Sequence, residues 1–154
     1  MPHLLPRLAT LAIAIVLGTA GCRDLEVLTE SYATREEAVA AGALDRGWVP
    51  RMLPPGAREI RAAHDLDSNR RWGLFNFPGS DADALRARLG PEMSLAGQTC
   101  NPPRRIEWWP LLLRERLDHE QIVATGLRAY PAREGDLIVV VNWSQGRTYY
   151  WTRE

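Results

Sequence analysis

The sequence lacks an excess of charge of either sign. Its 154 residues carry 19 basic and 19 acidic side chains, and both signs are scattered along the chain. Proteins that bind nucleic acid concentrate basic side chains on one face, so this balance argues against a nucleic-acid partner. Lysine is absent and every basic side chain is Arg. We attribute this first to a GC-rich genome and only weakly to contacts with anions.

The sequence also lacks the motifs of the common catalytic and metal-binding classes. It contains no Gly-x-Ser-x-Gly element, no Gly-rich phosphate loop and no paired-cysteine zinc motif. His119-Glu120 is not followed by the second histidine that a zinc-protease motif requires. We therefore expect no catalytic residue, no metal site and no cofactor.

No apolar run is long enough to span a membrane. The longest covers residues 8–18, whereas a spanning helix needs about twenty residues. Arg7 precedes this run and small residues follow it, which is typical of a secretory signal peptide. The small residues end at a cysteine, Thr19-Ala20-Gly21-Cys22, and resemble the lipobox of bacterial lipoproteins. In that family the cysteine is diacylated and becomes the new N-terminus.

This resemblance implies a membrane anchor on Cys22. Two or more acyl chains on one residue hold more firmly than a single chain, which binds only marginally. In lipoproteins of Gram-negative bacteria, a residue other than Asp after the cysteine implies the outer membrane, and Arg23 has that position. We therefore expect a cell-envelope lipoprotein on the periplasmic side of the outer membrane. The alternative is a secreted protein cut near Gly21.

Cysteine is otherwise scarce. If Cys22 is acylated, Cys100 has no intramolecular partner for a disulfide in an oxidising compartment. We interpret Cys100 first as a buried, inert thiol. An intermolecular disulfide and a nucleophile are the alternatives.

Length and composition predict one folded domain. We assign residues 1–21 to the signal peptide and residues 22–154 to a single domain. The chain has 45% apolar residues and six tryptophans, which is ample material for a core. Because predicted strands and helices are mixed, we expect an α+β fold with two or three helices packed on a small antiparallel sheet.

The local patterns predict the following elements. In chain order they are a strand at 25–29, a helix after Thr34 that falters at Gly42, a hairpin of 57–65 and 71–77, a helix capped by Ser80 and stopped at Gly90, a short helix from Pro110, a strand at 122–130, and a hairpin of 136–143 and 147–153. Thr34 and Glu37 form a capping box. In the first hairpin Trp72 and Phe75 face opposite sides, which indicates a strand covered on both faces.

The last hairpin allows a predicted register. A three-residue loop, 144–146, ends in a glycine suited to a left-handed conformation. That loop pairs Val139 with Trp151 and places both on the buried face. Tyr150 then lies on the other, mixed face, where we expect it to be free to contact a partner. Aromatic side chains of this half would stack on envelope sugars or anchor a protein if exposed, with core packing as the main alternative.

A polar stretch in the first hairpin resembles the start of a calcium loop. Its oxygen-bearing residues are Asp65, Asp67 and Asn69. Arg70 stands where a sharp-turn glycine is needed and Asn76 where a bidentate Glu is needed, so we expect a turn without an ion. A weak polar-ligand site and a catalytic pair of His64 with an Asp are the alternatives.

The middle of the chain resembles the YbbD head domain, a family of short, uncharacterised bacterial lipoproteins and secreted proteins. The resemblance covers residues 30–77, and its most specific part is the His-Asp-Leu-Asp stretch at 64–67. The other residues that carry it are Gly47, Trp48, Val49, Pro50, Leu53, Pro54, Ile60, Ser68, Asn69, Trp72 and Phe75. It implies a lipoprotein with a small α+β fold and implies no activity.

The sequence therefore predicts a non-catalytic envelope lipoprotein that serves as a protein-interaction or structural module. Its expected partners are the membrane, through lipid on Cys22, and an envelope protein. The candidate binding residues are His64, Asp65, Asp67, Asn69 and Tyr150. One alternative is a module that binds a glycan or small molecule, which exposed aromatics in a groove would favour. The other is a hydrolase that uses His64 or Cys100, which a histidine beside a nucleophile would favour.

Overall fold

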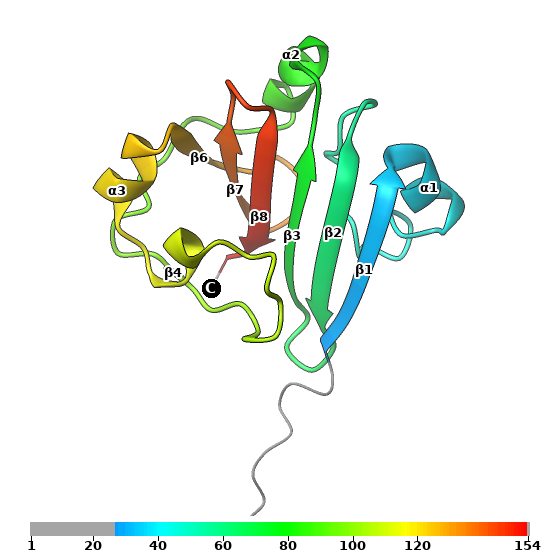
Figure 1. Ribbon diagram of the computed structural model, residues 1–154, viewed down its shortest axis with the longest axis horizontal. Helices are drawn as coiled ribbons and strands as arrows, with labels where there is room; N and C mark the ends of the chain where they lie inside the picture. Colours follow the sequence, from blue (N-terminus) through cyan, green and yellow to red (C-terminus); the bar gives the residue numbers. More distant parts are fainter. Residues whose placement is uncertain (1–26, 154) are drawn as a thin grey trace, which may run out of the picture.

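The computed structural model describes residues 27–153, so the predicted signal peptide and Cys22 lie outside the described residues. The described chain forms a six-stranded antiparallel sheet in the order β1-β2-β3-β8-β7-β6 (Figure 1). Its strands are β1 (Val27–Thr34), β2 (Arg58–Asp65), β3 (Arg70–Asn76), β6 (Leu127–Pro131), β7 (Leu137–Asn142) and β8 (Arg147–Thr152). A separate ladder pairs β4 (Thr99–Cys100) with β5 (Glu115–Arg116).

The first three strands are neighbours in the sheet, as in a meander. Thr34 ends β1 and caps α1 (Arg35–Ala40), because its hydroxyl accepts the backbone N–H of Glu37 at 3.3 Å. The Glu37 carboxylate accepts the N–H of Ala33 at 2.7 Å in return. Gly42 follows the helix with φ 70°. The predicted capping box, the faltering at Gly42 and the β2–β3 hairpin are confirmed.

The last three strands form a second meander, and β8 pairs with β3 to join the two. The outer edge of β6 is covered by the chain before it. Gly90 N–H donates to the Pro131 carbonyl and Met93 N–H donates to the Ala129 carbonyl, both at 2.8 Å. This covering strip satisfies backbone groups that an edge strand would otherwise expose.

The predicted α+β fold is wrong, because the described chain is mostly sheet. Its α-helices α1, α2 (Ala82–Arg86) and α3 (His119–Ala124) contain six, five and six residues, and each buries a single residue. The 3₁₀ turns η1 (Gly79–Asp81) and η2 (Leu111–Leu113) are shorter still. Helices this short have no apolar stripe long enough to cover a sheet. Within residues 27–153 no helix is long and apolar enough to cross a membrane.

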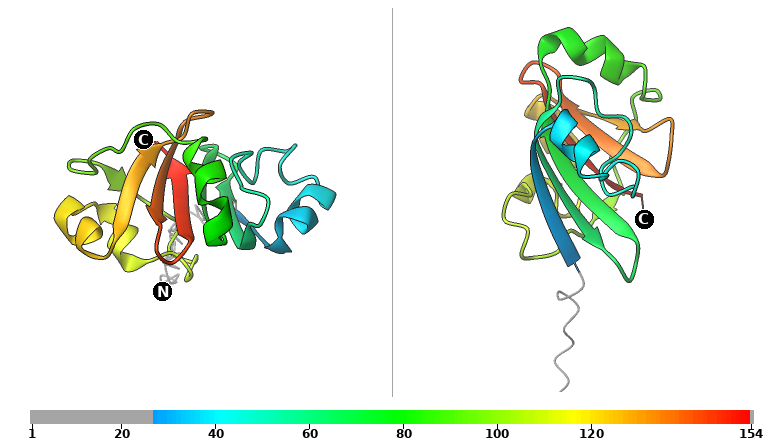
Figure 2. Two further views of the ribbon diagram at one scale, coloured as in Figure 1. Left: turned by 90° about the horizontal axis from the view of Figure 1, so that it is seen from above. Right: turned by 90° about the vertical axis from the view of Figure 1, so that its right-hand side faces the viewer.

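Irregular segments, together with these short helices, cover both faces of the sheet (Figure 2). The buried side chains that cover one face are Ala38, Ala43, Val49, Met52, Leu53, Leu85 and Leu89. Those that cover the other are Leu95, Cys100, Ile106, Trp109, Leu113, Leu117 and Ile122. All six residues of β7 are buried between these layers, which accounts for its continuous apolar run. Trp72 and Phe75 enter opposite clusters, so the prediction of a strand covered on both faces is confirmed.

Several predicted boundaries differ from the structure. The strand predicted at 25–29 is β1, which continues to Thr34, and the helix predicted to stop at Gly90 ends at Arg86. Ser80 lies in η1, and α2 begins two residues later without a side-chain cap. Pro110 precedes only the single turn η2. Ile122 belongs to α3 and not to a strand, because Asp118 accepts the N–H of Gln121 at 3.1 Å and starts a helix there.

The predicted register of the β7–β8 hairpin is wrong by one residue. Its loop has four residues, 143–146, and Tyr150 pairs with Val139, which the prediction paired with Trp151. Because both faces are covered, neither aromatic side chain reaches the surface, and the exposed fractions are 0% for Tyr150 and 1% for Trp151. The predicted burial of Trp151 is confirmed, and the predicted free face at Tyr150 is wrong.

Hydrogen bonds of Asn142 set this register. Its side-chain oxygen accepts the Ser144 hydroxyl at 2.8 Å and the N–H of Gln145 at 3.1 Å, so the turn begins one residue earlier than predicted. Its amide nitrogen donates to the carbonyl of Thr125 at 3.3 Å, outside the hairpin. Gly146 has φ 63°, so the predicted left-handed glycine is confirmed.

Candidate functional site

The polar stretch between β2 and β3 stabilises its own turn. The Asp65 carboxylate accepts the N–H of Asp67 at 3.1 Å, the N–H of Ser68 at 3.4 Å and the Ser68 hydroxyl at 2.8 Å. Asn69 adopts φ 54°, a left-handed conformation that Asn tolerates better than most residues. The predicted turn chemistry is confirmed.

The negative charge of Asp65 suits its role as the hydrogen-bond acceptor of this turn. Desolvation raises the pKa of its carboxyl, but the hydrogen bonds from Ser68 and Asp67 and the charge of Arg70 outweigh that effect. The pKa of Asp65 therefore lies below its ordinary value, and the carboxylate remains an acceptor. No group of three or more His, Cys, Asp or Glu side chains in residues 27–153 is arranged to hold a metal ion.

His64 ties this turn to the connector that follows α1. Its Nε2–H donates to the side-chain oxygen of Asn69 at 2.9 Å, and its ring meets Trp48 edge to face with centroids 6.2 Å apart. Arg71 donates to the carbonyl of Gly47 at 2.6 Å. Two stretches that carry the family resemblance, at 47–50 and 64–69, therefore contact each other. Their contacts fix the connector on the hairpin.

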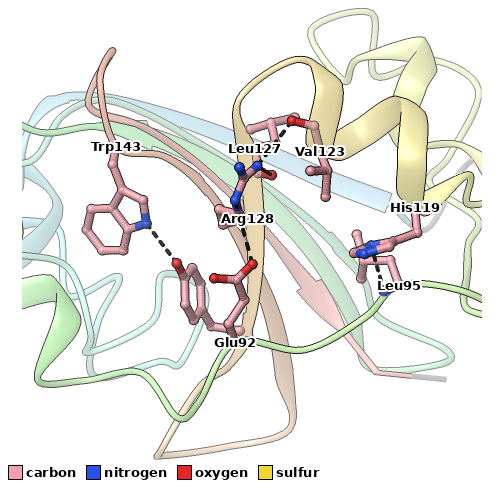
Figure 3. A network of polar contacts seen from close by, with 8 residues as sticks. Glu92, Leu95, His119, Val123, Leu127, Arg128 and Trp143 are labelled. Carbon is pink, nitrogen blue, oxygen red and sulfur yellow. Dashed lines mark hydrogen bonds and ion pairs between the residues drawn. The ribbon is translucent and has the colours of Figure 1, made fainter.

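Among residues 27–153, the structure does not bring Cys100 together with His64 or His119 in a catalytic arrangement. Cys100 is fully buried in the layer over one face of the sheet, whereas His64 packs on the opposite face against Trp48. The β4–β5 ladder sets Cys100 opposite Glu115, four residues before His119. Nδ1 of His119 accepts the N–H of Leu95 at 3.3 Å (Figure 3). Each group thus has a structural contact of its own.

A polar network holds the edge of the sheet together (Figure 3). Arg128 on β6 donates to the carbonyl of Val123 in α3 at 3.1 Å and forms an ion pair with Glu92 at 3.6 Å. On the same strand the Tyr130 hydroxyl accepts the indole N–H of Trp143 at 2.9 Å. These contacts join β6 to α3, to the segment that contains Glu92 and to the β7–β8 loop that contains Trp143. We therefore assign them a structural role.

Most aromatic side chains of the C-terminal half lie in the core. Trp109 meets Trp151 and Tyr149 edge to face, with centroids 6.1 and 5.9 Å apart. Tyr150 is fully buried on the other face, and burial raises the pKa of its phenol well above the ordinary value. The structure therefore removes Tyr150 from the surface residues that could contact a partner. Trp108, Trp143 and Tyr149 are half-buried, and Trp108 lines a hollow.

This hollow has a volume of about 420 Å³ and lies over β1, β2 and β3, beside Trp108. Its lining includes Ser31, Glu59, Arg61, Leu74, Trp108 and Arg147. Leu74 is buried and forms its floor, opposite the exposed Arg61 in the β2–β3 ladder. The hollow thus combines an apolar floor, a half-buried tryptophan, two arginines and the acidic Glu59.

A β-bulge shapes one side of the hollow. The β2–β3 register shifts between Arg58 and Arg61, and Glu59 in the bulge has φ 50°. The Glu59 carboxylate accepts the Asn76 amide and lies 3.9 Å from the Arg147 guanidinium. Bulges commonly re-aim side chains beside binding sites. Sequence analysis missed this hollow, because a bulge leaves no pattern in β2 and Trp108 comes from a distant segment.

These observations define the molecule as a mostly β protein, with one antiparallel sheet between two irregular layers and an open hollow near one edge. Residues 26–76, about a third of the chain, match the family model of the YbbD head domain. The predicted resemblance to that family is confirmed, and the matched part ends with β3. No curated protein and no solved structure matches the chain.

Proposed function

We propose that this protein is a non-catalytic lipoprotein of the cell envelope, anchored through lipid on Cys22 to the periplasmic side of the outer membrane. Its β domain serves as a protein-interaction or structural module. The run Thr19-Ala20-Gly21-Cys22 after a short apolar stretch supports the anchor. The match to the YbbD head domain over residues 26–76 agrees with a lipoprotein, which the resemblance to that family implies.

One observation carries the non-catalytic part of the proposal. The side chains that could take part in catalysis form bonds within the fold. Asp65 holds a turn, His64 bonds to Asn69 and His119 accepts a backbone N–H. Cys100 is fully buried. A nucleophile needs access to substrate, and the buried Cys100 lacks it.

Mass spectrometry of the protein purified from its own cells tests the anchor. We expect a chain that begins at an acylated Cys22 and partitions with membranes. Cys22→Ser is expected to lose the lipid and the membrane association, whereas the control Cys100→Ala keeps both because Cys100 is buried in the folded domain. An unmodified N-terminus at or after Gly21 in a soluble fraction contradicts the proposal.

The hollow favours a second candidate function, the binding of a glycan. An aromatic side chain packs on the apolar face of a sugar ring, and guanidinium groups pair with carboxylates. Trp108 and Arg61 line one hollow and supply both kinds of contact, while Arg147 in the same hollow is paired with Glu59. Carboxylate-bearing sugar peptides of the cell wall combine both features, so soluble peptidoglycan fragments are the appropriate probe.

Titration calorimetry with these fragments tests the second candidate. We expect Trp108→Ala to weaken binding by about tenfold or more, as the loss of a central aromatic contact does. Leu111→Ala is the matched control, because Leu111 is 85% exposed and lies outside the hollow. Absence of binding to the unaltered protein, or equal binding by both variants, argues against a glycan site.

A further inference from the structure

A short linker would hold the domain close to the membrane. This inference rests on the proposed lipid anchor at Cys22. Four residues separate Cys22 from Val27, the first residue of β1. Five residue steps span at most about 17 Å even when fully extended. The eight-residue strand β1 is itself about 23 Å long, so the linker keeps the start of β1 closer to the lipidated residue than the far end of that strand.

The start of β1 lies at the same end of the molecule as the β2–β3 turn (Figure 1). Val27 pairs with Asp65 and Leu28 pairs with His64. Arg105 precedes Ile106 in one of the covering layers, and its guanidinium donates to the carbonyl of Val27 at this end of the molecule. The opposite end of β1 leads directly into α1.

The end that carries Val27 has an amphipathic surface, which we call the tether-proximal surface. Its members are Leu28, Trp48, Leu66, Arg70 and Arg105, and the acidic Asp65 and Asp67 flank Leu66 in the turn. Leu28 is 41% exposed, and Leu66 is 50% exposed at the tip of the turn. The half-buried Trp48 joins them through its contact with His64, which is the ladder partner of Leu28. Apolar side chains, tryptophan and Arg together are the composition found where proteins rest on lipid headgroups.

We propose that the tether-proximal surface packs on the phospholipid headgroups, with Leu66 entering the interface. Leu66 and Leu28 lose water from their apolar surface there, and Arg105 at the edge pairs with lipid phosphates. The hollow lies beside Ser31 and Glu59, farther along β1 and β2, and it stays open to the periplasm. The lipid surface thereby fixes which side of the domain meets other envelope components.

Hydrogen exchange on vesicles tests this contact. The sheet and both of its layers are built from residues 27–153, so a chain that starts at Cys22 keeps the fold. Cys22 is coupled to a maleimide lipid in vesicles of phosphatidylethanolamine and phosphatidylglycerol, while the buried Cys100 is protected from the reagent. The comparison is the same chain coupled to a soluble maleimide.

We expect amides of residues 64–71 to exchange at least about threefold more slowly on vesicles, since lipid keeps water from the turn. Amides of α1 should not change.

A matched pair of variants makes the test specific. Leu66→Glu and Val39→Glu each replace an exposed apolar side chain, 50% and 48% exposed, but Val39 lies in α1 at the far end. We expect Leu66→Glu to abolish the slower exchange and Val39→Glu to retain it. Unchanged exchange at 64–71 in the coupled protein, or equal exchange in the two variants, overturns the contact. Because the lipid is attached chemically, this outcome is independent of whether cells acylate Cys22.

Discussion

Gly73→Ala is expected to destabilise the protein by about 3 kcal/mol or more, because an added methyl group has no room in this core. Gly73 on β3 pairs with Tyr150 on β8, and the tyrosine ring lies over the glycine. A Cβ atom at Gly73 would lie closer than 3.0 Å to ring carbons and the hydroxyl of Tyr150. That ring is fully buried and packs against Phe75 with centroids 6.4 Å apart, so it cannot move aside. Denaturant unfolding measures the loss.

Gly79→Ala is the control for this substitution. A Cβ at Gly79 meets no atom within 4 Å, so we expect a change of less than about 0.5 kcal/mol. The double variant Gly73→Ala/Tyr150→Leu should cost less than the sum of its single substitutions, because a smaller side chain makes room for the methyl group. Equal unfolding midpoints for Gly73→Ala and Gly79→Ala contradict the proposed close approach.

Trp151→Ala and Tyr150→Ala are each expected to cost about 3–5 kcal/mol, as the removal of a large buried aromatic side chain does. The two side chains point to opposite faces of β8, and each enters its own core cluster. Trp151 meets the ring of Trp109 edge to face. Tyr150 fills the space that Gly73 leaves. Unfolding of the two variants in denaturant, followed by circular dichroism, gives both values.

Leu111→Ala again serves as the control, because Leu111 is 85% exposed and its loss should cost less than about 0.5 kcal/mol. A much smaller cost for Tyr150→Ala than for Trp151→Ala would show that one face of β8 is open. That result would restore the register predicted from the sequence and contradict the pairing of Tyr150 with Val139.

The part that matches the YbbD head domain is not a complete sheet in this protein. Residues 26–76 end with β3, and the free edge of β3 is paired with β8 from outside the match. Gly73 belongs to the matched part and Tyr150 does not, yet their contact closes the core between the two meanders. A substitution in either part should therefore unfold the same sheet.

Local chemistry made several features predictable from the sequence. The cap at Thr34, the turn held by Asp65 and the left-handed Gly146 each depend on neighbours within a few residues. The opposite faces of Trp72 and Phe75 follow from the two-residue period of a strand. The signal in Asp118 and Gln121 was also local, and a capping rule applied there would have located α3.

Other features depend on contacts between distant segments. No local pattern states that β8 lies beside β3, that Trp108 forms a wall over β2, or that irregular segments replace long helices as the covering layers. The β7–β8 register depends on Asn142, whose amide bonds to Thr125 outside the hairpin. The sequence by itself determined the turns, the caps and the resemblance to a family, because those signals lie within short stretches. Only the tertiary structure decided which faces are buried, since burial depends on what a distant part of the chain places against each strand.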